Sequence, residues 1–384
     1  MNAASSSRIP SLTLTPVFEA ARLGYDQTRI PAIVRTSQGT LIAFCEGRRG
    51  PGGDWSRIDI LMRRSTDAGK SWLDVEVLLK SDGGPVSNAT PIANRNGVVH
   101  LLFQRDYSRC FVTESRNEGA TWDSPRDLTP VFEAFRADYN WKVLAPGPGH
   151  GIQLSGGRLI VPVWLSAPAE SMTSGGDHRP SCVATIVSDD GGATWKRGDI
   201  VVGTSPDFLN PSETVAVELT DGRVMLNIRN ESPGHRRLVS ISPDGERNWS
   251  QPVFDERLFE PVCMASLVSA TSARDGERIL LFCNPAGNPR SDDPNTLPFC
   301  SRENGVIRVS CDDGKNWERQ RVIDAGPFGY SDMAVSPDGT VFCLYDSGVW
   351  GSPPHHLPTH VELAKFDVAW IEADPLSGGP KKPE

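Results

Sequence analysis

An arginine stands inside a stretch of chain that otherwise suits a buried strand. The stretch reads Tyr-Asp-Gln-Thr-Arg-Ile-Pro-Ala-Ile from Tyr25 to Ile33, with Arg29 as its cation. A guanidinium removed from water needs an anion beside it, so Arg29 is either half of a structural ion pair or a ligand for an anionic substrate. A loop rich in glycine and proline follows and carries an acid, Asp54, near its end. Surface loops of this kind often hold catalytic and binding side chains.

The elements that must position these side chains are repetitive. A pattern Ser-x-Asp-x-Gly-x-x-Trp occurs intact over residues 65–72, 188–195 and 310–317, and in degenerate form over 115–122 and 242–249. Its Asp can accept hydrogen bonds from nearby backbone N–H groups, its Gly allows a positive φ, and its Trp can pack between neighbouring sheets. A motif that returns once per structural unit cannot lie five times in one pocket, so each copy predicts a hairpin turn.

The spacing of the repeats predicts the fold. Successive copies begin roughly sixty residues apart, which is long enough for one four-stranded unit. Short apolar runs and Asp-Gly or Gly-Gly turns dominate, and long helical periodicities are absent. We therefore expect an all-β protein, a six-bladed β-propeller whose last blade is closed by both termini. Residues 1–384 would form one domain, with flexible tails at about 1–15 and 374–384.

The composition argues against several classes of partner. The formal net charge is −9 and basic residues form no run longer than a pair, so a nucleic-acid partner is disfavoured. No apolar stretch reaches the roughly 18 residues needed to cross a bilayer. Residues 1–7 lack the apolar core of a signal peptide, so the chain as printed is expected in the cytoplasm; a removed signal would place it outside the cell or in the periplasm. Eight cysteines without a C-x-x-C pair are expected as buried thiols, the seven histidines form no metal constellation, and no metal or other cofactor is implied.

These features resemble a known family. Arg-Ile-Pro ahead of an apolar strand, followed by several copies of the repeat, which is known as the Asp box, resembles the sialidase (neuraminidase) superfamily, and especially the glycoside hydrolase family 33 type. The likeness extends from about Arg29 to Asp346. It implies that Arg29 is the first of three arginines that hold the carboxylate of the substrate. A planar guanidinium fits a carboxylate bidentately and keeps its charge at any working pH.

Two later stretches resemble the family segments that carry the other arginines. Residues 213–229 are similar to the stretch with a catalytic Glu and then the second arginine, which implies these roles for Glu213 and Arg229. Arg302, shortly before the last Asp box, takes the place of the third arginine. Arg308 competes for that role, but its position inside the strand that leads to the turn favours a structural one.

A tyrosine is the implied nucleophile. The run Phe-Gly-Tyr-Ser-Asp-Met at residues 328–333 resembles the family's Tyr-Ser motif, which assigns Tyr330 as the nucleophile and Glu213 as its base. An Asp or Glu nucleophile would approach an anomeric carbon that bears a carboxylate, and the like charges would repel. A neutral phenol activated by a neighbouring carboxylate avoids that repulsion.

The resemblance also assigns the general acid/base. In the family this role belongs to an Asp shortly after an acid-x-Arg run, and Asp54 stands there. Asp59 is the rival, although it lies within an expected strand and more readily faces a structural partner. Glu46 and Arg48 would line the floor of the pocket, with Arg48 meeting a ring hydroxyl.

Three further positions are implied as substrate-binding or supporting residues. Asn88 lies in a Ser-Asn-Ala-Thr-Pro run similar to a loop that approaches the substrate, and Asp346 takes the place of the acid that supports Arg29. Trp164 stands where the family often places tyrosines that contact the acyl or glycerol arm. That departure, together with the polar run Gln-Arg-Asp at residues 104–106, leaves open which nonulosonic acid fits.

The resemblance thus implies a retaining exo-glycosidase that hydrolyses terminal, α-ketosidically linked sialic acids, or related nonulosonic acids such as the deaminated form, from glycoconjugates. The expected partner is a sialylated glycan or a related 2-keto sugar conjugate. One alternative is a non-hydrolytic propeller that binds acidic glycans or proteins, because Asp boxes also occur in such modules. Another is a trans-sialidase. Hydrolysis is preferred because Tyr330, Glu213 and Asp54 together serve only catalysis, and because nothing resembles the added lectin domain common among family transferases.

Overall fold

The computed structural model describes residues 11–50, 52–168, 178–287, 301–350 and 356–373. The strands in these ranges are β1 (Thr13–Glu19), β2 (Gln27–Arg35), β3 (Leu41–Arg49), β4 (Arg57–Ser65), β5 (Glu76–Leu79), β6 (Val86–Ala93), β7 (Val99–Arg105), β8 (Arg109–Ser115), β9 (Arg126–Asp127), β10 (Val143–Pro146), β11 (Ile152–Gln153), β12 (Leu159–Ser166), β13 (Ser181–Ser188), β14 (Lys196–Gly203), β15 (Thr214–Glu218), β16 (Val224–Ile228), β17 (Arg236–Ser242), β18 (Val253–Phe259), β19 (Ser266–Thr271), β20 (Arg278–Pro285), β21 (Glu303–Ser310), β22 (Arg319–Pro327), β23 (Ser331–Val335), β24 (Thr340–Trp350) and β25 (His356–Asp367). The short helices are α1 (Ala20–Leu23), α2 (Thr129–Glu133), the 3-10 helix η1 (Ala134–Ala137) and α3 (Val368–Glu372). None of these helices is long and apolar enough to cross a membrane.

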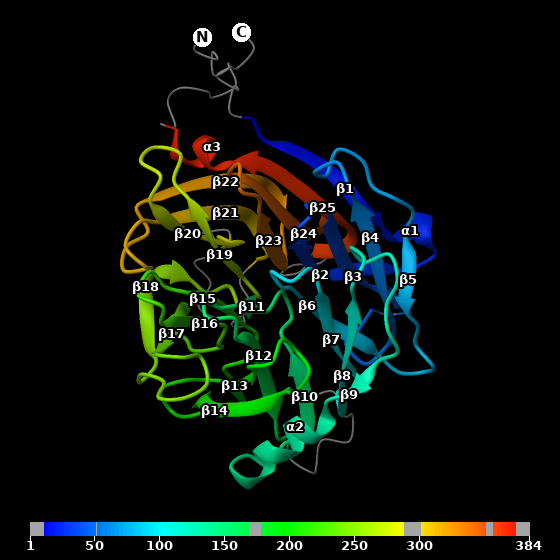
Figure 1. Cartoon of the computed structure of the whole chain (residues 1–384), viewed down its shortest axis with the longest axis vertical. Coiled ribbons are helices and arrows are strands. Elements are labelled where there is room, and N and C mark those ends of the chain that lie inside the picture. Colours follow the sequence, from blue (N-terminus) through cyan, green and yellow to red (C-terminus); the bar gives the residue numbers. More distant parts are fainter. Residues whose placement is uncertain (1–10, 51, 169–177, 288–300, 351–355, 374–384) are drawn as a thin grey trace.

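The strands form six antiparallel sheets arranged as blades round one axis (Figure 1). The sheet orders are β2-β3-β4-β5, β6-β7-β8-β9, β10-β12-β13-β14 with β11 also on β12, β15-β16-β17-β18, β19-β20-β21-β22 and β23-β24-β25-β1. First strands of neighbouring blades contact one another, as β2 does β6 and β23, so they surround the axis. This is the six-bladed propeller that the repeats predict.

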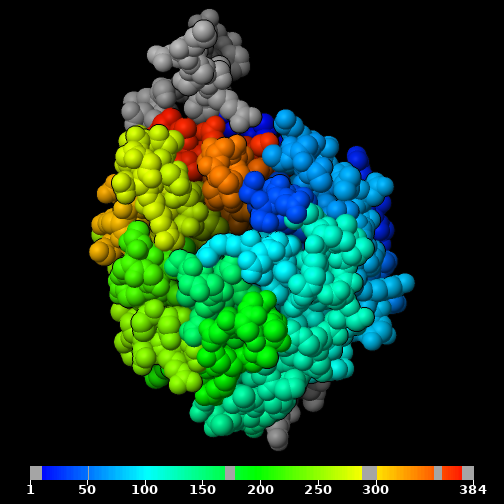
Figure 2. All heavy atoms as spheres, viewed as in Figure 1, coloured from blue at the N-terminus to red at the C-terminus, as the bar shows by residue number. Residues whose placement is uncertain are grey.

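The sixth blade joins the two ends of the chain. β1 pairs antiparallel with β25, with Thr13 opposite Lys365 and Glu19 opposite His360, and Figure 2 shows the blue and red ends of the sequence side by side. The expected closure by both termini is confirmed. Residues 13–15, which were expected within a flexible tail at about 1–15, lie in β1, because the β-branched and apolar residues from Thr13 onward complete the outer edge of this sheet. Residues 1–10 and 374–384 lie outside the described part of the chain.

The Asp boxes are turns between the third and fourth strands of five blades. In each turn the serine hydroxyl accepts the N–H of the motif glycine, as in Gly69 N to Ser65 Oγ at 2.9 Å. Asp67 Oδ1 accepts the N–H of Ser71 at 2.9 Å. Trp195 packs in a core made by the second and third blades. The repeats therefore build the scaffold, as predicted.

The candidate site residues gather at the other end of the sheets. Arg29 lies near the start of β2, Tyr330 directly precedes β23, and Arg229 directly follows β16. In antiparallel blades, the starts of first strands and the ends of second strands share one end, whereas third strands end at the opposite one. One end of the propeller is thus repetitive, and the other receives different side chains from each blade.

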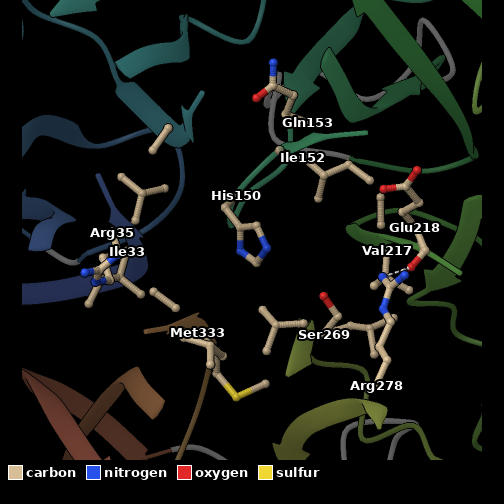
Figure 3. A pocket seen from close by; sticks show the side chains of 18 residues that line it. Ile33, Arg35, His150, Ile152, Gln153, Val217, Glu218, Ser269, Arg278 and Met333 are labelled. Carbon is tan, nitrogen blue, oxygen red and sulfur yellow. Dashed lines mark hydrogen bonds between the residues drawn. The ribbon is translucent and has the colours of Figure 1, made fainter. Parts of the chain in front are cut away.

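A glycine-rich segment, Gly147–Gly151, crosses the axis between the two ends. Pro148 lines the pocket at the site end, and His150 lines a cavity of about 280 Å³ at the other end. Figure 3 shows the imidazole of His150 projecting into this cavity from the segment. Gly149 has a φ of 92°, a conformation that other residues rarely adopt, and a β-carbon there would lie 2.3 Å from Met264 Cε, so glycine suits this position.

A buried ion pair anchors that segment. His150 Nδ1 lies 2.6 Å from Asp332 Oδ1, and Asp332 Oδ2 accepts the N–H of Ile33 at 2.9 Å. Burial alone would lower the pKa of His150, but the Asp332 carboxylate raises it above the ordinary value. The pair therefore connects the axial segment to β23, the strand after Tyr330, and to β2, the strand of Arg29.

We expect Asp332→Asn to lower the free energy of unfolding by about 3 kcal/mol at acidic pH, because it removes one partner of a buried pair. Since the folded-state pKa of His150 is raised, this stabilisation is full below about 6.5, the unfolded value, and is lost as the pH rises through the folded value. Urea unfolding at about pH 5.5 and about pH 9 checks this. The difference in unfolding free energy between Asp332→Asn and wild type should be smaller at the higher pH. Asp221→Asn, on an exposed turn, should change this free energy little at either pH. An equal difference at both pH values would contradict the ion pair.

The cysteines were expected as buried thiols. Seven of them lie in the described residues and all seven are free; six are buried and Cys311 is exposed. The prediction is confirmed for the six, and Cys300 lies outside the described residues.

Candidate active site

Three arginines surround one tyrosine at the site end of the axis. The guanidinium carbons of Arg29, Arg229 and Arg302 lie 5.3, 5.9 and 5.2 Å from the centroid of the Tyr330 ring. They come from three blades, because Arg29 lies in β2, Arg229 directly follows β16 and Arg302 directly precedes β21, so only the closed ring brings them together. Three guanidinium groups at this spacing can grip one small anion beside the phenol.

Tyr330 is paired with Glu213. Its hydroxyl donates to Glu213 Oε1 at 2.5 Å and accepts from Arg229 Nη1 at 2.6 Å, and Arg229 Nη1 also donates to Glu213 Oε2. Burial raises the pKa of Tyr330 well above its ordinary value, although Arg229 favours the phenolate. The phenol is therefore neutral at neutral pH and has a carboxylate in place to take its proton.

Backbone and carboxylate contacts fix the tyrosine and two of the arginines from behind. Asp346 Oδ1 accepts the N–H of Tyr330 at 2.9 Å, and Asp346 Oδ2 lies 3.6 Å from Arg29 Nε. Arg302 Nη2 donates to the carbonyl of Val262 at 2.8 Å. Asp346 is fully buried and does not line the pocket, so it supports Arg29 and Tyr330 instead of contacting a ligand.

The loop acid is held by a second charged cluster. Asp54 Oδ1 lies 2.8 Å from Arg48 Nη1, and Arg48 also donates to Glu46 Oε2 at 2.6 and 2.9 Å. Burial would raise the pKa of Asp54, but the Arg48 guanidinium holds it well below its ordinary value. Glu46 differs from the expectation that it lines the floor: it is buried beneath Arg48 and accepts the N–H of Asn88 at 3.0 Å.

The pocket has a volume of about 400 Å³. It brings together nine of the eleven residues predicted for the site, namely Arg29, Arg48, Asp54, Asn88, Trp164, Glu213, Arg229, Arg302 and Tyr330. The other two, Glu46 and Asp346, lie behind it as described above.

Neither rival residue lines the pocket. Asp59 accepts from the hydroxyl of Tyr25 at 2.6 Å and from the N–H of Ser81 at 2.7 Å, so its carboxylate serves the first blade. Arg308 donates to Asn284 Oδ1 at 2.9 Å inside the fifth blade. The geometry therefore favours Asp54 and Arg302 over these alternatives.

Sequence reasoning missed several pocket residues. Tyr107 reaches the pocket because both it and Asp106 adopt a positive φ in the turn after β7. Arg179 and Glu231 form a two-pronged ion pair, at 2.7 and 2.8 Å, that also lines the pocket. The position of Glu231, two residues after Arg229, could have drawn notice, but the turn that brings Tyr107 inward has no simple pattern.

The fold and the site define a class: an Asp-box propeller with a three-arginine anion site built round a tyrosine and a carboxylate. A family model described as a BNR repeat-like domain matches residues 85–343, which is most of the chain. The chain belongs to this BNR-repeat, sialidase-type family.

Individual proteins agree with this membership. The chain is 30% identical to a sialidase of Micromonospora viridifaciens over 91% of its own length. Among solved structures, Hadza microbial sialidase Hz136 matches 93% of this chain and 69% of its own, with a TM-score of 0.75 at 24% identity. The intramolecular trans-sialidase from Ruminococcus gnavus, solved with oseltamivir carboxylate, matches 94% and 98%, with a TM-score of 0.73 at 17% identity. At these identities the solved structures show the fold alone. The chain spans 53% of the length of the Micromonospora protein.

Proposed function

We propose that the chain is a retaining exo-α-sialidase that hydrolyses terminal sialic acids, or closely related 2-keto sugars, from glycoconjugates. The observation that carries this proposal is the convergence of Arg29, Arg229 and Arg302 on Tyr330, whose hydroxyl donates to Glu213. A sialic acid bears a carboxylate on its anomeric carbon, so an anion grip beside a neutral nucleophile suits it. The membership of the family supports the same activity.

The proposed reaction has two displacements at the anomeric carbon. In the first, the oxygen of Tyr330 bonds to that carbon as the bond to the leaving oxygen breaks; Glu213 takes the phenol proton and Asp54 gives a proton to the leaving oxygen. In the second, water attacks the same carbon, Asp54 takes a proton from the water, and Tyr330 leaves and regains its proton from Glu213. Two inversions give net retention.

Aryl α-ketosides that differ at carbon 5 test the proposal. We expect release of the aryl alcohol from the N-acetylneuraminic acid derivative, the deaminated derivative or both, and proton NMR should show the α anomer as the first free sugar. Binding without release from any of these ketosides would favour the non-hydrolytic alternative. Adding lactose would detect transfer to an acceptor sugar, the outcome that the trans-sialidase alternative predicts.

The carboxylate grip makes a separate prediction. Arg302→Lys keeps the charge but loses the planar fork. One charge-assisted hydrogen bond is worth about 1.5–3 kcal/mol, so we expect kcat/KM for an aryl ketoside to fall by about 10- to 100-fold. The matched control is Arg308→Lys, which alters an arginine of β21, the strand that Arg302 directly precedes, and which lies outside the pocket. If Arg308→Lys had the larger effect, the assignment of the third arginine would be wrong.

A further inference from the structure

The residue after the loop acid Asp54 is a partly exposed tryptophan, Trp55, that packs on other aromatic rings. Trp55 is a large apolar side chain with 37% of its surface exposed, and it directly follows Asp54. Its ring centroid lies 4.9 Å from that of Tyr107 and 6.2 Å from that of His178. Both distances fall in the range of attractive aromatic contacts.

The surface under Trp55 is a group of three packed rings. Tyr107 and Trp164 each contact His178, with centroids 4.9 and 5.0 Å apart, and the rings of Tyr107 and Trp164 are 6.2 Å apart. We call these three residues the aromatic base. Tyr107 and Trp164 are almost wholly buried, and burial lowers the pKa of His178, which keeps its imidazole neutral. The aromatic base is therefore an uncharged and firmly packed platform from the second and third blades.

The loop that Trp55 secures has few other fixed points. Gly50 and Gly52 both have a φ of 76°, and a β-carbon on Gly50 would meet no atom within 4 Å. Arg48 Nη1 donates to the carbonyl of Gly52 at 2.8 Å and to Asp54 at 2.8 Å, and Asp26 accepts the N–H of Gly50 at 2.7 Å. In the described residues of the loop, Asp26 holds the start at Gly50, and the contacts nearest the acid are those of Arg48 on one side and Trp55 on the other.

The contact of Asp54 with Arg48 weakens when Asp54 carries a proton, whereas the contact of Trp55 with the aromatic base does not. Arg48 attracts Asp54 as a carboxylate, and the same attraction keeps the pKa of Asp54 low. An Asp54 that carries the proton for the leaving oxygen is neutral, so its contact with Arg48 loses the attraction between opposite charges and keeps only the hydrogen bond that the guanidinium donates. The contact between Trp55 and the aromatic base involves no titrating charge at Asp54 and persists through this change.

We propose that Trp55 is a positioning residue that keeps the protonated Asp54 within reach of the leaving oxygen by packing on Tyr107 and His178. The proposal rests on the proposed function, because it needs Asp54 to act as the acid. It makes the aromatic base part of acid catalysis, in addition to any contact of its buried rings with the sugar. Truncating Trp55 should therefore affect substrates according to how much they need the acid.

The test compares two leaving groups in Trp55→Ala. Sialyllactose leaves as a poor alkoxide and needs a proton, whereas a nitrophenyl ketoside does not. A displacement near 1 Å can cost about 10²-fold in rate, so we expect kcat on sialyllactose to fall by about that factor, with less than about threefold change on the nitrophenyl ketoside. Trp55→Phe should restore most of the lost rate, because the ring contact is kept. Leu73→Ala, which truncates an apolar side chain that is 47% exposed and follows an Asp box, should leave both rates unchanged.

Several results would overturn the proposal. An equal loss on both substrates would mean a general structural effect, and a change confined to KM for sialyllactose would mean that Trp55 binds the leaving sugar. No change in Trp55→Ala, while Asp54→Ala separates the two substrates, would reject the role of Trp55 and leave the proposed function intact. If Asp54→Ala itself fails to separate the substrates, the acid assignment fails first and takes this proposal with it. Thermal melting of each variant shows whether the fold survives.

Discussion

Tyr330→Phe is expected to lower kcat by at least about 10³-fold on both sialyllactose and a nitrophenyl ketoside, because the covalent step is lost whatever the leaving group. The loss should leave the binding of the carboxylate largely intact, since the three arginines lie round the ring and only Arg229 touches the hydroxyl. Steady-state kinetics with both substrates measures the loss of kcat. The affinity of the inactive variant for the substrate, compared with that of wild type, measures the retained binding. A water molecule in place of the phenol oxygen could support residual hydrolysis with inversion, which NMR of the first anomer would detect.

Tyr345→Phe is the matched control for this change. Tyr345 is a buried tyrosine whose hydroxyl donates to Asp324 at 2.8 Å, away from the pocket. Its substitution removes a partly buried hydroxyl that contacts Asp324 and, at 3.3 Å, Glu362. We expect a loss of about 1 kcal/mol in stability and an unchanged kcat. If Tyr330→Phe lost no more activity than Tyr345→Phe, Tyr330 would not be the nucleophile.

Asp54→Ala is expected to divide the substrates. General acid catalysis contributes about 10²–10⁴-fold, so cleavage of sialyllactose should fall by that amount, whereas the nitrophenyl ketoside, whose phenolate leaves unaided, should lose far less in its first step. Because Asp54 also acts as the base for the incoming water, the second step becomes limiting for the activated substrate, and a burst of nitrophenol should appear.

Asp59→Asn provides the comparison for the loop acid. Asp59 accepts hydrogen bonds from Tyr25 and Ser81, so its loss should reduce stability without any dependence on the leaving group. If Asp59→Asn slowed sialyllactose cleavage much more than nitrophenyl ketoside cleavage, and Asp54→Ala did not, Asp59 would be the acid.

The architecture could be predicted from the sequence because the turns that define it are local and repeated. The Asp box at residues 65–72 closes its turn with its own serine, aspartate and glycine, so one copy can be recognised without the rest of the chain. The convergence of Arg29, Arg229 and Arg302 was predictable only through the resemblance to the family. Nothing local to any of these arginines specifies the partners that the closed ring supplies.

Other features could not be predicted because they depend on contacts between blades. The axial segment with His150 meets Asp332 across 182 positions of sequence. Tyr107 enters the pocket through two successive positive φ angles, and Trp55 finds Tyr107 and His178 only when the first three blades are assembled. Composition and motif spacing do not specify contacts between residues of different blades, so only the structure reveals these contacts.

The most direct test of the central claim is to trap the covalent intermediate. A 2,3-difluoro sialic acid carries a good leaving group at carbon 2, and its fluorine at carbon 3 slows both displacements, so the intermediate should accumulate. Digestion and mass spectrometry of the inactivated protein should find one fluorosialosyl group on the peptide that contains Tyr330, and none in Tyr330→Phe. A label on Glu213 or Asp54, or turnover of sialosides with retention in Tyr330→Phe, would contradict the claim that Tyr330 attacks the sugar.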